Sequence, residues 1–146
     1  MTRFGHMIGK SLGTSRWIKV DQPRIDTFAD VTEDRQFIHI DPDAAAQGPY
    51  GITVAHGFLT LSLLSTLAYD VVPALGPYES SINYGFDRLR FLAAVPSDAR
   101  LRAHFTLNSV TEKAPNRVLL TLAVRMEIEG EETPALIADW LVLLHF

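Results

Sequence analysis

Hydrophobic residues alternate with polar ones along much of the second half of the chain. Apolar side chains occupy every second position in residues 101–107 and 118–128, which is the period of a strand that buries one face. Residues 82–91 alternate as well, but the pattern changes parity near Asp87 and Arg88. A change of parity turns side chains to the other face, so we predict a β-bulge or a bend there. Together these segments predict an antiparallel sheet.

The last predicted strand, residues 136–144, is apolar on both faces. Its first residue and every second one after it are apolar, and Ile137, Leu141 and Leu143 have the opposite parity. A strand with one face in water would carry polar residues at alternate positions. We therefore expect a partner subunit or another element to cover the second face.

The first half of the chain predicts a short strand, a short helix and one long apolar helix. Residues 14–20 form the strand, and Asp21 can cap a helix that has Pro23 in its first turn. Residues 57–72 are apolar nearly all round, which is typical of a central buried helix, and Pro73 ends it. A long helix followed by antiparallel strands predicts an α+β fold in which the sheet wraps around the helix.

Residues 31–55 have no sustained hydrophobic period. Irregular segments of this length are uncommon in compact domains and are often functional. Asp41 and Pro42 form a cap and first-turn pair, and Gly48 is a stop signal, so we predict one small helix between them. His39 is then expected to lie just before that helix.

Composition narrows the chemistry that this chain can perform. A length of 146 residues suits one domain, residues 1–146, and a net charge of −4 without basic runs predicts no nucleic-acid or membrane partner. Cysteine is absent, which removes disulfides, thiolate zinc sites and a cysteine nucleophile. We find no segment like a signal peptide and none that could span a bilayer, so a cytoplasmic location is expected.

The irregular segment and the start of the long helix hold the residues that could carry out chemistry. Asp34 and His39 are five positions apart, and a carboxylate beside an imidazole can hold and deprotonate one water near neutral pH. His56 and Gly57 stand at the start of the long helix. Free N–H groups at a helix start can stabilise developing negative charge, and a glycine permits close approach.

Other interpretations of these residues stay open on spacing alone. Each residue could have a purely structural role: Asp34 in a turn, Asp41 as a helix cap, and His39 as the partner of a backbone carbonyl. A metal site built from these three residues and His56 is conceivable, but their spacing matches no recognised metal motif. Serines within 57–72 lack the sharp glycine-flanked turn that exposes a catalytic serine.

Three segments resemble the MaoC-like enoyl-CoA hydratase family. Residues 28–45 resemble its hydratase motif, in which an Asp, an Asn-Pro pair, a His and an Asp-Pro pair follow one another. Residues 48–62 resemble the next block, where His-Gly opens the central helix, and residues 82–91 are similar to the following strand of the NodN-like branch. Here Gln36 and Phe37 replace the Asn-Pro pair, and glutamine is common in the NodN-like branch.

The resemblance implies a single hot-dog fold and a hydratase. Asp34 and His39 would bind one water and add it to C3 of a trans-2-enoyl thioester, giving an (R)-3-hydroxyacyl product, while the Gly57 N–H polarises the thioester carbonyl. The implied partners are a CoA or acyl-carrier-protein thioester and a second copy of the chain in a homodimer, with no cofactor and no metal. Residues expected to contact substrate are Gln36 in place of the orienting Asn, a supporting Ser65, His56, Asn83, and Arg88 and Arg90 as candidate phosphate contacts.

Two rival functions remain on the sequence alone. A hot-dog thioesterase needs a carboxylate aimed at water, commonly on or near the central helix, and residues 57–69 contain no acidic residue. A non-catalytic hot-dog protein that binds acyl thioesters, or pairs with a catalytic homologue, stays open because Gln36 and Phe37 depart from the motif.

Overall fold

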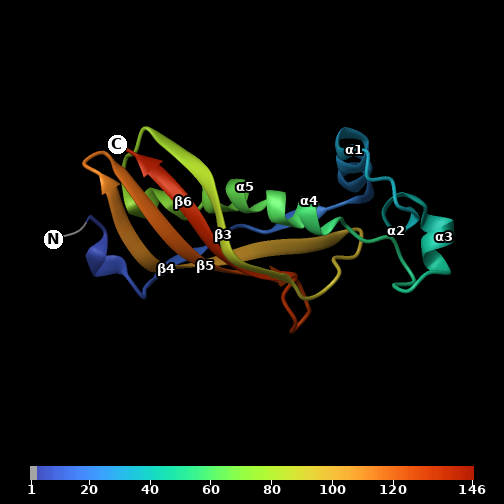
Figure 1. Ribbon diagram of the computed structural model, residues 1–146. Coiled ribbons are helices and arrows are strands. Elements are labelled where there is room, and N and C mark those ends of the chain that lie inside the picture. Colours follow the sequence, from blue (N-terminus) through green and yellow to red (C-terminus); the bar gives the residue numbers. More distant parts are fainter. Residues whose placement is uncertain (1–2) are drawn as a thin grey trace.

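The computed structural model describes residues 3–146 (Figure 1). The helices are η1 Gly5–Met7, α1 Gln22–Thr32, α2 Phe37–Ile40, α3 Pro42–Ala46, α4 Gly57–Ser62, α5 Leu64–Ala68 and η2 Val72–Leu75. The strands are β1 Ser11–Thr14, β2 Ile18–Val20, β3 Ser80–Phe91, β4 Ala99–Ala114, β5 Arg117–Ile128 and β6 Leu136–His145. Within the described chain, no helix is long and apolar enough to cross a bilayer.

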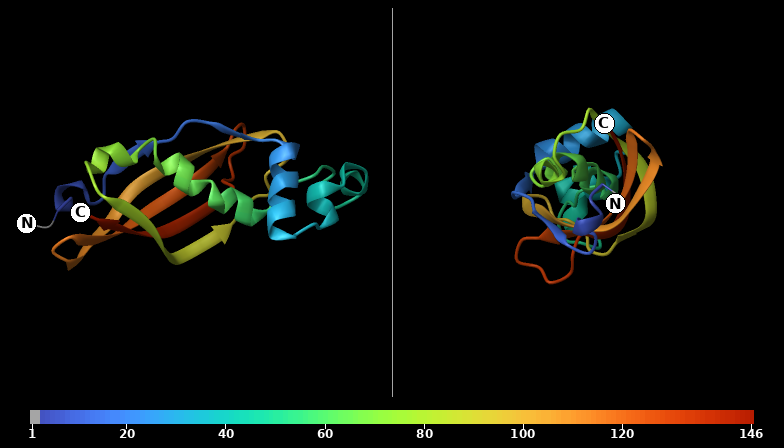
Figure 2. Two further views of the ribbon diagram at one scale, coloured as in Figure 1. Left: turned by 90° about the horizontal axis from the view of Figure 1, so that it is seen from above. Right: turned by 90° about the vertical axis from the view of Figure 1, so that its left-hand side faces the viewer.

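The strands form one antiparallel sheet that curves around α4 and α5 (Figures 1 and 2). Their order is β1-β4-β5-β6-β3, and β2 also pairs with β4. β3 therefore lies at an edge, although it follows the helices directly in sequence. This arrangement confirms the predicted α+β fold with a sheet wrapped around a central helix.

The strand boundaries differ from the prediction where side chains interrupt the sheet. The strand predicted over 14–20 is split between β1 and β2, because the Ser15 hydroxyl accepts a hydrogen bond from the Ala103 N–H at 2.9 Å. β4 extends well beyond the predicted 101–107. The register of β3 against β6 shifts between Phe86 and Arg88, which confirms the predicted bulge, and a second shift lies between Asn83 and Gly85.

The predicted single buried helix over 57–72 is wrong in its continuity, in its end and in its burial. The helix is interrupted at Leu63, and Pro73 lies inside η2 rather than beyond a helix end. Leu64 and Leu67 bury against the sheet, whereas Phe58 and Tyr69 are 67% and 68% exposed. The sheet of the same chain therefore covers only one side of α4 and α5. Apolar residues on all sides of these helices did not mean that all sides are buried.

Part of the apolar surface that remains uncovered lies along β3. The last strand, β6, was predicted to be apolar on both faces. In the structure one face of β6 is fully buried and the other is half-buried. On β3, Ile82, Tyr84 and Phe91 are 45%, 60% and 46% exposed. Exposed apolar side chains on an open edge strand are typical of a surface that pairs with another chain.

Candidate active site

Helices α1, α2 and α3 project beyond the sheet at the end where α4 begins (Figures 1 and 2). Asp21 caps α1 by accepting a hydrogen bond from the Arg24 N–H at 3.1 Å, as predicted. Asp41 caps α3 by accepting from the Ala44 N–H at 3.0 Å, which confirms the predicted small helix. The sequence did not predict α2, so His39 lies inside a short helix rather than before one.

His39 is buried and its ring has a fixed orientation. Its Nδ1 lies 2.6 Å from the Val54 carbonyl oxygen. Because a carbonyl only accepts hydrogen bonds, Nδ1 carries the proton and Nε2 keeps a lone pair in the neutral ring. The hydrogen bond between His39 and a backbone carbonyl, one of the roles considered for this residue, is therefore present. It leaves Nε2 free to act as a base.

The surroundings of His39 favour its neutral form. Burial lowers the pKa of His39 below its ordinary value, and His56 adds to the lowering. The hydrogen bond with Val54 and the charge of Asp34 act in the opposite direction. Burial is the larger effect because removing an imidazolium from water is costly. The ring is therefore ready to accept a proton at neutral pH.

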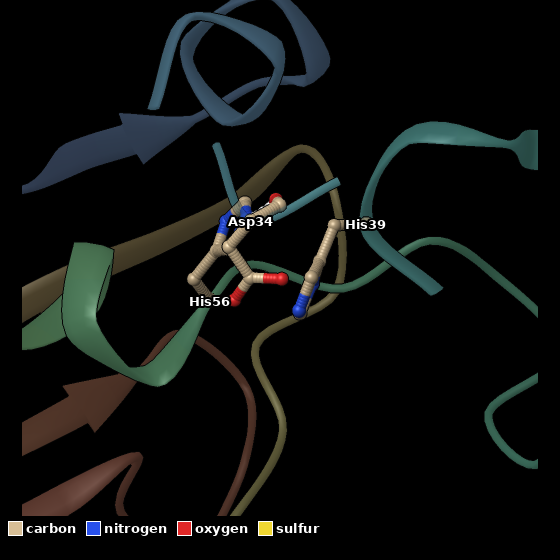
Figure 3. A group of neighbouring side chains, drawn as sticks. All are labelled: Asp34, His39 and His56. Atoms are coloured by element: carbon tan, nitrogen blue, oxygen red, sulfur yellow. Dashed lines mark hydrogen bonds between the residues drawn. The ribbon is translucent and has the colours of Figure 1, made fainter. Parts of the chain in front are cut away.

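Asp34, His39 and His56 come together at the loop between α1 and α2 (Figure 3). One polar atom from each of the three lies within 4.8 Å of the other two. Asp34 is exposed and turns a carboxylate oxygen towards His39. The rings of His39 and His56 stack with centroids 3.8 Å apart and planes inclined by 23°.

The stacked rings do not form a good metal site. Imidazole binds an ion through an in-plane lone pair at about 2.0–2.1 Å. The planes of His39 and His56 are nearly parallel, and one nitrogen of each ring, His39 Nδ1 and His56 Nε2, already faces a backbone carbonyl oxygen. A carboxylate beside an imidazole is better suited to holding a water molecule.

A cavity of about 380 Å³ opens next to His39. Gly57, Thr60, Tyr50 and Phe91 line it together with His39. Gly57 is the first residue of α4, and no oxygen of residues 3–146 accepts a hydrogen bond from its N–H. A Cβ at Gly57 would lie 3.2 Å from two ring carbons of Phe91. The absence of a side chain thus keeps a free N–H and the Phe91 ring side by side.

The other residues expected to contact substrate do not gather around this cavity. Gln36 is exposed at the start of α2, and its side chain does not cap the helix. Asn83 Nδ2 donates to Ser65 Oγ at 3.3 Å, and both line a separate cavity of about 320 Å³ between α5 and the sheet. His56 is only 2% exposed and is not part of the wall of the His39 cavity.

Arg88 and Arg90 are engaged elsewhere on the protein. Arg88 Nε lies 3.3 Å from Asp139 Oδ2, and Arg90 Nη1 donates to the Leu89 carbonyl oxygen at 2.8 Å. An arginine that is paired with a carboxylate is less available to a phosphate.

Sequence reasoning missed the residues that hold His39 in place. Gln22 Nε2 donates to the His39 carbonyl oxygen at 2.7 Å, and Thr53 Oγ1 donates to Gln22 Oε1 at 2.6 Å. Gln22 thus ties α1 both to α2 and to the segment that contains Val54. The contacts join residues 17 and 31 positions apart, so no local spacing could have predicted them.

An antiparallel sheet wrapped around a central helix defines a protein of the hot-dog class. The family model described as MaoC like domain matches residues 3–128. The chain therefore belongs to the MaoC-like dehydratase family, which supports a hydratase or dehydratase kind of activity.

Individual proteins agree with this assignment. The chain is 45% identical over 140 residues to Nodulation protein N of Rhizobium leguminosarum bv. viciae, covering 95% of this chain and 87% of that protein. It is 40% identical over 134 residues to 3-hydroxyacyl-thioester dehydratase Z of Mycobacterium tuberculosis, covering 92% and 88%. The solved structure of the (R)-hydratase from A. caviae involved in PHA biosynthesis matches with a TM-score of 0.75 and 25% identity, covering 92% and 94%.

Proposed function

We propose that this protein adds water to a trans-2-enoyl thioester to give an (R)-3-hydroxyacyl thioester, and catalyses the reverse dehydration. Asp34 and His39 are the catalytic pair, and the Gly57 N–H binds the thioester carbonyl oxygen. The observation that carries the proposal is the contact of His39 Nδ1 with the Val54 carbonyl oxygen, which leaves Nε2 as the acceptor of the ring, in a cluster that also holds the Asp34 carboxylate. The cavity shared by His39 and Gly57 supplies the space for the thioester.

The first step uses the two side chains together. A water bound between them donates one hydrogen bond to His39 Nε2 and the other to Asp34. As the water oxygen bonds to C3, Nε2 takes a proton and the nearby carboxylate balances the imidazolium charge. Acid–base catalysis of this kind contributes about 10²–10⁴-fold in rate.

The second step places the proton on C2. Addition at C3 moves the electron pair of the double bond towards the carbonyl, so negative charge builds on the thioester oxygen. The Gly57 N–H is already in place to stabilise that charge, and a donor of this kind is worth about 3 kcal/mol. The imidazolium of His39 then returns its proton to C2, so that H and OH are added across the bond.

A direct assay separates the proposal from its rivals. Incubation with crotonyl-CoA should remove the enoyl absorbance without releasing free thiol. Release of thiol from crotonyl-CoA or from saturated butyryl-CoA would indicate a thioesterase instead. The absence of acidic residues on α4 and α5 favours hydration over hydrolysis. Binding of enoyl-CoA thioesters across chain lengths with no turnover of any of them would support a non-catalytic binding protein.

The lowered pKa of His39 predicts how activity depends on pH. The base must be unprotonated, so kcat/KM should fall as the pH drops through the pKa of His39. Because that pKa is lowered, the acid limb should lie below the ordinary imidazole value of about 6.5. A pH profile of kcat/KM for crotonyl-CoA measures this, and an acid limb above that value would contradict the assignment.

The proposal includes a homodimer in which the β3 edges of two copies pair. Its support is the open position of β3 in the sheet and the exposed Ile82, Tyr84 and Phe91 along it. Phe58 and Tyr69 add apolar surface on the uncovered side of α4 and α5. Light scattering should give twice the chain mass, and Tyr84→Lys should shift it towards one chain mass. The cytoplasmic location and the carrier of the thioester stay predictions.

A further inference from the structure

His56 makes its contacts with the catalytic pair rather than with the cavity. Its Nε2 lies 2.9 Å from the backbone carbonyl oxygen of Asp34, and its ring stacks on His39 at 3.8 Å. Phe28 packs against the ring as well, with centroids 4.9 Å apart. The side chain is 2% exposed. One buried residue therefore contacts both members of the pair, which its sequence position at the helix start did not indicate.

Asp34 depends on its backbone for its position. No residue in 3–146 donates a hydrogen bond or forms an ion pair with its carboxylate. It follows Glu33, which ends α1 in the left-handed region with φ 62°. Its N–H reaches only the nearby Thr32 hydroxyl at 3.5 Å. The bond from His56 ties its main chain to the start of α4, across 22 residues of sequence.

The tautomer of His56 is fixed by the same contact. A carbonyl oxygen only accepts, so Nε2 carries the proton in the bond with Asp34. Nδ1 is buried and has no partner among the residues that the structure describes. A proton on Nδ1 would leave a buried donor without an acceptor, which is costly. His56 thereby presents Nε2 as its donor, aimed at the Asp34 carbonyl oxygen.

We infer that His56 is a positioning residue: it holds the Asp34 loop so that the carboxylate faces His39, and it does not contact substrate. This inference rests on the proposed function for its link to catalysis. A shift of about 1 Å in a catalytic group can cost on the order of 10²-fold in rate. The bond to the Asp34 carbonyl and the stacked ring both restrict such a shift.

Two variants separate the donor from the ring. Glutamine can place its amide near Nε2 and keep the donor, whereas phenylalanine keeps a flat ring without it. We expect His56→Phe to lower kcat for crotonyl-CoA by on the order of 10²-fold, with KM changed less than about threefold. His56→Gln should recover most of kcat. A raised KM with unchanged kcat in His56→Phe, or no recovery in His56→Gln, would overturn the inference.

His145→Phe is the matched control. His145 lies on β6 with its Nε2 also buried and without a partner among the described residues, and it is not in the wall of the His39 cavity. His145→Phe should change kcat by less than about twofold, because His145 contacts neither Asp34 nor His39. Thermal unfolding of each variant shows whether the fold is kept.

A measurement on the unmodified protein tests the inference without any turnover. Nitrogen-15 NMR of the imidazoles should show the proton of His56 on Nε2 and that of His39 on Nδ1. A proton on Nδ1 of His56 would remove its bond to Asp34 and overturn the inference. If the protein turns over no enoyl thioester, the proposed function fails, while the NMR result still decides whether His56 holds the Asp34 loop.

Discussion

Replacing Asp34 with asparagine should lower kcat for hydration of crotonyl-CoA by about 10²–10⁴-fold. The side chain is exposed and its carboxylate makes no hydrogen bond within residues 3–146, so the substitution removes the charge with little effect on the fold. His39→Ala should cost a similar factor, because it removes the base itself. Initial rates measured from the loss of enoyl absorbance give both values.

The double variant and a remote control make this result specific. The double variant Asp34→Asn with His39→Ala should have a kcat no more than about tenfold below that of the less active single variant. The effects of two groups that act as a unit do not add. His104 lies on β4, between the buried Ala103 and Phe105, and its Nε2 lies 2.7 Å from Glu127 Oε2. His104→Ala should keep kcat within about twofold. Near wild-type rates in both Asp34→Asn and His39→Ala would remove the catalytic pair from the proposal.

Adding one methyl group at Gly57 is expected to lower kcat/KM by about 10²-fold. The new Cβ would stand 3.2 Å from Cδ1 and Cε1 of Phe91, which is tighter than ordinary contact. The ring or the start of α4 must then move by a few tenths of an ångström. Either movement disturbs the cavity at the point where the thioester carbonyl is proposed to bind. Kinetics of Gly57→Ala with crotonyl-CoA measure the effect.

A double-mutant cycle shows whether Phe91 is the cause. In a Phe91→Ala background the methyl group has space, so Gly57→Ala should cost less than about fivefold there. Phe91 also lines the cavity, and the cycle removes its own contribution from the comparison. Equal losses in the two backgrounds would show that the contact with Phe91 does not matter.

The sheet was predictable because its signal is strong and local. Long strands such as β5 alternate over many residues, and the parity change near Asp87 marks the bulge directly. Helix α2 is a single turn of four residues, which is too short to show a helical period. The interruption at Leu63 was hidden because an apolar residue looks the same in a continuous helix and in a broken one.

The candidate site was predictable in its residue types but not in its supports. Asp34 and His39 could be chosen because a carboxylate and an imidazole suit the chemistry and match the family motif. Gln22 and Thr53 hold His39 through contacts between distant segments, and only the folded chain brings these together. The family resemblance implied that His56 contacts substrate, but the side chain is buried and stacks on His39, behind the proposed catalytic pair.

The two register shifts of β3 should also limit aggregation along this edge. A long regular edge strand with apolar side chains is a template on which any extended chain can add, including unfolded copies. The shifts at Asn83/Gly85 and Phe86/Arg88 divide this edge into short stretches. Only a partner that bends at the same places can follow it, so foreign strands gain few bonds. The same irregularity that shapes the edge therefore limits which chains can attach to it.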